Sequence, residues 1–497
     1  MKRITALFLV ILLLGSLLIS CSDADEGNPT ADPAATTAAV EDANANAPSG
    51  ETKLEPNLPA ADFGGETINF LVRSEEYHWY WCSKEIYAEE ENGDQLNDAV
   101  YKRNRHIEDK YNFNIAETRV ANPNDTAQKT IKSGEKIYDV MMLGLKEGAS
   151  FAQSGMLVDL HTVPNLDLKQ PWWDQRGVRD LSIGNKLFFA LGDLNVMDND
   201  ATQAIVFNKK LVIDYQLESP YDLVRNNGWT IDKYYEMIRK VSTDVNADGK
   251  FDGEDILGHL SDAGKTNALF VGAGGRITTK DANDYPVLAM NDERTIGIVE
   301  KVVEIMIDSK NTLLATDYTT QYNNPWDDFT RPMFINNQGL FYLVGMGTVQ
   351  LMRNMDADFG LMPMPKFNAE QAEYYNVIEA PSTNAVMIPS TNERLEFTGH
   401  VLEAMAAESM YTLTPAYYDV NFMVKAIRDE DSIEMLKIIL ETRAYDIGNV
   451  YDWAFVSSIL YDMVNTKKTD YVSMYEQRER RALVEMERTF EAYRQMG

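Results

Sequence analysis

The sequence predicts an α/β fold with two lobes, each a sheet flanked by helices. Short runs rich in β-branched and apolar residues alternate with longer amphipathic runs along most of the chain. This alternation is typical of a largely parallel sheet covered by helices on both faces. The roughly 435 residues after position 61 also exceed what one hydrophobic core usually organises. No internal repeat of solenoid length is present in the sequence, which favours globular lobes over a repeat array.

The N-terminus has the features of a secretory signal peptide, which we place at 1–20. Lys2 and Arg3 precede a short apolar run, and a membrane span needs about 20 such residues. The run ends in "LISC", which resembles a bacterial lipobox, so we expect Cys21 to carry the lipid, palmitate among its acyl chains. An ordinary cleaved signal followed by a chance cysteine is the alternative.

Residues 21–61 are rich in Asp, Ala, Asn, Thr and Pro and poor in aliphatic bulk, so we expect a disordered tether. The whole chain has a formal charge of −31, which disfavours nucleic acid as a partner because phosphates would be repelled. The chain has two cysteines. With Cys21 committed to lipid, the fold does not rely on a disulfide.

Hydrophobic periodicity places the main elements. Strands are expected at 66–73, 113–120, 138–144, 203–208, 256–261 and 384–390. Helices are expected at 95–111, near 125–134, at 230–242 and 294–310, and in a run to the C-terminus. Two apolar stripes should pack on the body: Val299, Val302, Val303 and Met306 in one helix, and Leu483, Met486, Phe490 and Tyr493 in the last.

One acidic stretch has the spacing of a calcium-binding loop. Positions 1, 3, 5, 7, 9 and 12 of an EF-hand pattern are held by Asp244, Asn246, Asp248, Lys250, Asp252 and Asp255. Gly249 stands where the pattern needs a sharp turn, and Lys250 would offer its carbonyl. The following "ILGHLS" is strand-like, so we expect an isolated structural Ca²⁺ loop and not a paired sensor. A metal-free turn rich in Asp and Asn is the alternative.

Familiar enzyme motifs do not occur in the sequence, and its five histidines are scattered, which disfavours a zinc site or a histidine-based triad. A carboxylate pair remains open among 77 acidic residues. Aromatic clusters are more informative, since "YHWYW", "PWWD", "NPWDDF" and "YDWAF" stand beside polar loop signals. Flat rings that cover sugar C–H faces suit a carbohydrate cleft, although each Trp could equally fill the core.

Four segments resemble the extracellular solute-binding proteins of bacterial ABC importers, in the carbohydrate-type family 1. They are "YDVMMLGLKEGASFAQSGMLVDL", "FFALGDLN…AIVFNKKL", "PYDLVRNNGWTIDKYYEMIRKVSTDVNADGKFDGEDILG" and "GLFYLVGMG…MDADFGLMPMPK". The resemblance implies a periplasmic-binding-protein-like fold with crossing strands near 187–195 and 384–390. On that pattern the first lobe holds 62–195 and about 380–430. The second holds 196–379 and about 431–497, with the calcium loop as an insertion.

The resemblance also implies where ligand is held, namely at the loops between the lobes. The residues that occupy these places are Arg73, Glu75, Trp79, Trp81, Lys146, Glu147, Asp193, Asn195, Phe270, Tyr342 and Gly345, with Trp326 and Trp453 as additional rings. Met346 and Gly347 stand where sugar receptors of this family often have a Trp.

The sequence therefore favours a lipid-anchored extracellular receptor, not an enzyme, that captures a small solute and delivers it to an ABC permease. A sugar or oligosaccharide is the expected solute. The alternatives are a surface glycosidase or lyase that uses a carboxylate pair, and a structural or sensory lipoprotein without a ligand.

Overall fold

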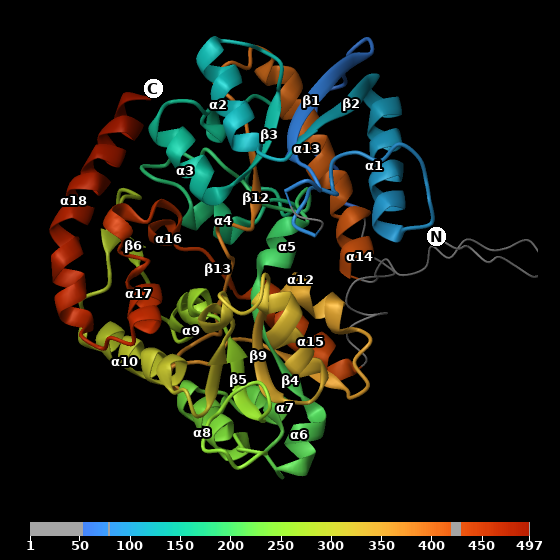
Figure 1. The fold of residues 1–497 in the computed structure, drawn as a ribbon. Coiled ribbons are helices and arrows are strands. Elements are labelled where there is room, and N and C mark those ends of the chain that lie inside the picture. The colour runs from blue at the N-terminus through green and yellow to red at the C-terminus, as the bar shows by residue number, and fades with distance from the viewer. Residues whose placement is uncertain (1–52, 78–79, 419–428, 497) are drawn as a thin grey trace, which may run out of the picture. The chain divides into compact units, whose positions relative to one another are not determined.

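The computed structural model of the chain is drawn in Figure 1. It describes residues 53–77, 80–418 and 429–496. The expected signal peptide, the lipidation site Cys21, most of the expected tether and Trp79 lie outside the described residues. No helix of the described residues has the length and apolar character needed to cross a bilayer.

The first sheet has the strand order β12-β3-β1-β2. Three strands are parallel, and β12 runs antiparallel to β3. The strands are β1 (Glu66–Arg73), β2 (Phe113–Val120), β3 (Val140–Gly144) and β12 (Asn384–Met387). Their helices are α1 (Gln95–Tyr111), α2 (Pro123–Ser133), α3 (Leu145–Gln153), α13 (Leu395–Ser409) and α14 (Leu413–Tyr418). Because β2 and β3 flank β1, right-handed crossovers put α1 and α2 on opposite faces, as Figure 1 shows.

The second sheet has the order β10-β4-β9-β5-β8 and is mixed. β4 is antiparallel to both neighbours, whereas β9, β5 and β8 are parallel. The strands are β4 (Gln203–Asn208), β5 (Leu257–Ser261), β8 (Thr312–Leu314), β9 (Gly339–Gly345) and β10 (Phe359–Met362). Helices of this half include α6 (Lys209–Asp214), α7 (Pro220–Arg225), α8 (Ile231–Val241), α9 (Thr266–Gly272), α10 (Glu293–Ile307), α11 (Arg331–Ile335), α12 (Met346–Val349) and α15 (Glu430–Glu441).

The chain passes between the two sheets more than once. The first passage runs through α5 (Met197–Ala201) into β4, and the return runs through β11 (Asn376–Val377) to β12. A third crossing segment, β13 (Arg443–Ala444), pairs in parallel with β11. The resemblance placed the first crossing and the return near 187–195 and 384–390, and the structure puts both passages within about ten residues of those segments.

The C-terminal region follows β13 with α16 (Ile447–Tyr451), α17 (Ile459–Thr466) and the long α18 (Tyr471–Gln495). Met486, Phe490 and Tyr493 of α18 are buried, but Leu483, expected on the same stripe, is 51% exposed. The expectation for Leu483 was wrong because the buried stripe passes through Ala482, four residues before Met486. The expected stripe of α10 is fully buried, as predicted.

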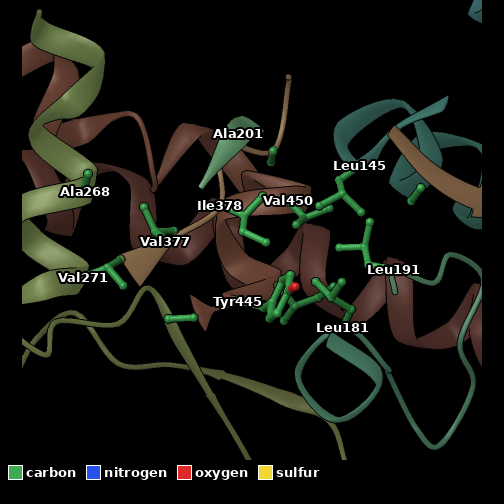
Figure 2. Close-up of a cluster of buried hydrophobic side chains, with 14 of the residues drawn as sticks. Leu145, Leu181, Leu191, Ala201, Ala268, Val271, Val377, Ile378, Tyr445 and Val450 are labelled. Carbon is green, nitrogen blue, oxygen red and sulfur yellow. The ribbon is translucent and has the colours of Figure 1, made fainter. Parts of the chain in front are cut away.

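A continuous hydrophobic core joins the elements around the crossing segments. Figure 2 shows part of it, with Val377 and Ile378 of the return segment between α9 on one side and α3 and α16 on the other. The labelled side chains are Leu145, Leu181, Leu191, Ala201, Ala268, Val271, Val377, Ile378, Tyr445 and Val450. The crossing segments are therefore packed side chain to side chain and are not loose linkers.

Residues 53–61 of the expected tether lie against the body. The ammonium of Lys53 pairs with Glu408 at 2.6 Å, and the backbone N–H of Leu54 donates to the hydroxyl of Tyr411 at 2.9 Å. Both partners belong to or follow α13. The chain is thus held against α13 before it enters the first strand.

Candidate ligand-binding site

A pocket of about 210 Å³ lies where the crossing segments meet the ends of two strands. Lys146 follows β3 of the first sheet, and Lys265 and Asn267 follow β5 of the second. The remaining lining comes from Gln203 at the start of β4, Gly264, Ala268, the return segment 377–381, and Asn449, Ser457, Ser458 and Tyr461. Carboxyl ends of parallel strands are the usual place for ligands in α/β sheets, which makes this pocket the candidate site.

An ion pair stands in the wall of the pocket. The Lys265 ammonium lies 2.9 Å from the Glu379 carboxylate, to which the Gln203 amide also donates at 3.4 Å. Burial acts against the charged form of Lys265, but Glu379 and nearby Asp262 outweigh it, so the pKa of Lys265 is raised. Lys265 therefore stays charged at neutral pH, with its charge balanced inside the site.

Three acceptor atoms at this site are shielded from solvent and have no hydrogen-bond partner among the described residues. Two of them, Oε1 of Gln203 and Oδ1 of Asn267, belong to side chains that line the pocket. The third is Oε2 of Glu147, whose neighbour Lys146 lines it. A buried polar atom left without a partner costs about 1–3 kcal/mol, so a ligand that donates hydrogen bonds here would relieve that cost.

Several residues expected from the sequence gather at or beside this pocket. Lys146 lines it, and its ammonium lies 3.7 Å from the Asp452 carboxylate. Gly345 ends β9, and a side chain added there would touch the ring of Trp81 at 3.9 Å and the amide of Gln203 at 3.3 Å. The structure thus brings Trp81 and Gly345 together next to a residue of the pocket wall.

Other expected residues are engaged elsewhere, and ligand contact by them stays a prediction. Arg73 is buried over the ring of Tyr77 at 4.4 Å, and Glu75 pairs with Arg119 at 2.6 Å. The hydroxyl of Thr414 donates to Asp193, and burial raises the pKa of Asp193 to about 6. Asn195 is buried and donates to the carbonyl of Asn384 at 2.8 Å.

The remaining expected rings are mostly in the core. Phe270 and Tyr342 are buried, and Trp453 is stacked on Tyr451 with its ring centroid 4.9 Å away. Trp326 is half exposed and donates from its indole nitrogen to Asp262 at 3.1 Å. Contact of these rings with ligand stays a prediction, since neither Trp326 nor Trp453 is part of the pocket lining.

Sequence reasoning missed most of the polar lining, including Lys265, Asn267 and Glu379. The signal for the first two was present, because "DAGKTN" directly follows the expected strand at 256–261. No local sequence pattern marks Glu379 or Asn449 as a site residue. Both belong to short segments that reach the pocket only because the chain passes between the two sheets.

The acidic loop between α8 and β5 has several features of the calcium pattern. Gly249 has a φ of +80°, the left-handed conformation that the sharp turn needs. Asp255 is buried and accepts backbone N–H groups from Val245 and Asp252, whereas Oδ1 of Asp244 is shielded and has no partner in the described part of the chain. Among the described residues, no three acidic, histidine or cysteine side chains converge as a metal set.

No family model and no curated protein matches this chain, whereas solved structures do. An ABC substrate-binding protein from Listeria monocytogenes in complex with cycloalternan has a TM-score of 0.55 at 13% identity, covering 85% of this chain and 99% of the other.

A cyclo/maltodextrin-binding protein complexed with maltotetraose has the same TM-score and identity, covering 85% and 97% of the two chains. The GacH receptor of Streptomyces glaucescens, solved with acarbose, has a TM-score of 0.51 at 13% identity over 87% and 98%. This chain has the two-lobed fold of these binding proteins. The α/β fold class with two lobes predicted from the sequence is confirmed, although the first crossing runs through the helix α5 and not through a strand near 187–195.

Proposed function

We propose that the chain is an extracellular receptor, lipid-anchored through Cys21, that captures a sugar or oligosaccharide and delivers it to an ABC permease. Three findings support the proposal. The fold is that of binding proteins solved with cycloalternan, maltotetraose and acarbose. The pocket lies at the strand ends where that architecture holds ligands. Its polar lining suits a polyhydroxylated solute.

The observation that carries the proposal is the set of unpartnered acceptors at the pocket. Gln203 and Asn267 each present a shielded oxygen that needs a donor. A sugar supplies many hydroxyl donors at short spacing, and its ring oxygens and hydroxyls accept from Lys146 and Lys265 in return. A purely apolar solute would leave these groups unsatisfied at a cost of several kcal/mol.

Closure of the lobes is the expected response to ligand. The pocket draws Lys146 from the first sheet and Lys265 from the second. A solute that contacts both favours the arrangement in which both contacts form at once, and only that differential affinity can shift the equilibrium. The permease would then bind the surface that the two closed lobes present.

The glycosidase or lyase alternative has less support at this site. That chemistry uses two carboxyl groups that flank one bond, about 5–9.5 Å apart. Among the described residues that line the pocket, Glu379 is the one carboxylic acid, and it is paired with Lys265, whereas Glu147 lies beside the pocket and does not line it. We therefore favour the receptor.

Asn267→Ala tests the proposal. Because its Oδ1 has no partner among the residues that the structure describes, its removal should leave the melting temperature unchanged or slightly raised. Loss of a hydrogen bond to ligand should weaken binding by about tenfold or more. Binding is measured by thermal shift and calorimetry with a panel of mono- and oligosaccharides, with Asn283→Ala, at an exposed turn, as the matched control.

Two results would contradict the proposal. Cleavage of any glycan in the panel would make the chain an enzyme. Absence of a shift with every glycan, in a protein that melts cooperatively, would exclude a sugar receptor, because ligand stabilises by RT ln(1 + [L]/Kd).

We also propose that the acidic loop holds a structural Ca²⁺. Asp244, Asn246, Asp248 and Asp255 would supply oxygen ligands at the millimolar calcium found outside cells, and a bound ion would pin the end of α8 to β5. Asp248→Ala should lower the melting temperature more in calcium than in chelator. An equal loss in both buffers would indicate a metal-free turn.

A further inference from the structure

The first passage between the two sheets is anchored at each end. The side-chain amide of Asn195 donates to the carbonyl of Asn384 at 2.8 Å, and Asn384 begins β12 of the first sheet. The backbone N–H of Met346 donates to the carbonyl of Thr202 at 2.9 Å, and Met346 begins α12, which follows β9 of the second sheet. A rotation of one lobe against the other is therefore absorbed along this passage by residues 196–201, which we call the pivot.

Three consecutive polar side chains occupy the middle of the pivot. Asp198, Asn199 and Asp200 of α5 are all buried. Burial of polar and charged groups costs free energy, and well-packed apolar side chains of similar volume often stabilise a fold as well or better. Hydrogen bonds, unlike apolar contacts, depend on direction. The polar triplet is therefore suited to hold the pivot at one angle.

Hydroxyl groups of α14 hold two of these side chains. The hydroxyl of Tyr417 donates to the Asp200 carboxylate, and the hydroxyl of Tyr418 donates to Oδ1 of Asn199 at 2.7 Å. α14 lies beside α5 (Figure 1) and packs against α1 and α13, two helices of the first sheet. The two tyrosines thus tie the pivot to the first lobe through a segment more than 200 residues later in the chain.

These hydrogen bonds are formed outside the ligand pocket. Neither Tyr417 nor Tyr418 lines the pocket, and neither does the polar triplet of the pivot. In the same arrangement Lys146, which follows β3, and Lys265, which follows β5, line one pocket. The arrangement that the two tyrosines hold is therefore one in which a solute contacts both lobes at once.

We propose that α14 is a clamp on the pivot. The hydroxyls of Tyr417 and Tyr418 hold α5 at the angle at which both lobes reach the solute, and they set the affinity of the receptor from outside its pocket. The inference rests on the proposed function and adds positioning residues to it. A clamp of this kind acts on binding through the fraction of molecules that already have the binding arrangement.

Tyr418→Phe removes one hydroxyl of the clamp and keeps the ring. Oδ1 of Asn199 keeps a second donor, the Arg443 guanidinium at 3.0 Å, so Asn199 is not left without a partner and the variant should fold. Tyr235→Phe in α8 is the matched control. The hydroxyl of Tyr235 donates to Asp308, also at 2.7 Å, and both residues lie outside the pivot.

The angle between the lobes is measured without any sugar, as the distance between spin labels at Gln128→Cys in α2 and Lys240→Cys in α8. Both positions are exposed, whereas the native Cys82 is buried. Tyr235→Phe should give the distance distribution of the wild type. Tyr418→Phe should give a broader distribution with a second population. A distribution identical to that of the wild type overturns the clamp.

The effect on affinity is measured by calorimetry with linear oligosaccharides of two to six units from α-glucan, β-glucan and xylan series. Tyr418→Phe should bind about three- to tenfold more weakly than the wild type. Saturation with an oligosaccharide that binds should restore the wild-type label distance. Equal affinity of Tyr418→Phe and wild type overturns the clamp and leaves the receptor standing. Failure of every series to bind the wild type overturns the proposed function, and the label distances then decide by themselves whether α14 holds the pivot.

Discussion

Among the described residues, no cation forms an ion pair with the carboxyl group of Glu403 in α13. Its side chain is 2% exposed, and its Oε2 accepts from the indole nitrogen of Trp173 at 2.9 Å and from the backbone of Asp167 at 3.2 Å. Burial outweighs these hydrogen bonds and raises the pKa of Glu403 to about 7. In the unfolded chain the group should titrate near its ordinary value of 4.5.

This difference predicts a pH dependence of stability. Between about pH 4.5 and 7 the unfolded chain releases the proton that the folded protein keeps, so the free energy of unfolding falls as pH rises. Glu403→Gln removes this slope. Relative to wild type, the variant should gain up to about 3 kcal/mol at pH 8 and nothing at pH 4, as measured by urea denaturation. Exposed Glu396→Gln on the same helix is the control, and a gain that does not change with pH would contradict the assignment.

At the scale of single elements, strong periodicity and clear caps made the sequence informative. The strands at 66–73, 113–120 and 203–208 and the helix at 95–111 have the bounds predicted for them. The helix begins after Asp94, whose side chain caps two backbone N–H groups, and ends at Asn112, which has a φ of +52°. Short elements such as β11, β13 and α16 carry too few residues for a period, so packing partners from distant segments decide them.

On the scale of the whole molecule, Arg443 links the crossing segments. Its side chain is 15% exposed in β13. It pairs with Asp174 at 2.9 Å and with Asp198 of α5 at 3.2 Å, and it donates to Asn199 at 3.0 Å. Burial raises the pKa of Asp198 to about 7, although Arg443 opposes the shift. One guanidinium thus contacts two carboxyl groups where the sheets are joined.

Arg443→Met should destabilise the protein by about 3–5 kcal/mol at pH 8, because the carboxylates of Asp174 and buried Asp198 lose their cationic partner. The loss should shrink at pH 5, where protonation of Asp198 neutralises one of them. Chemical denaturation at the two pH values measures both effects. Adding Asp198→Asn to the variant should recover part of the loss at pH 8, and an equal loss at both pH values would argue against the charge explanation.

The sequence by itself determined the α/β class, the division into two lobes and most long elements, since these follow from hydrophobic periodicity, caps and chain length. It also marked Lys146, Glu147, Trp81 and Gly345, which lie at or beside the pocket. Only the tertiary structure decided the polar lining and the orientation of each ring. Trp453 and Phe455 are two residues apart in one aromatic cluster, yet one is buried and the other exposed. The difference arises from a backbone held by α18, a contact between distant segments that no local pattern encodes.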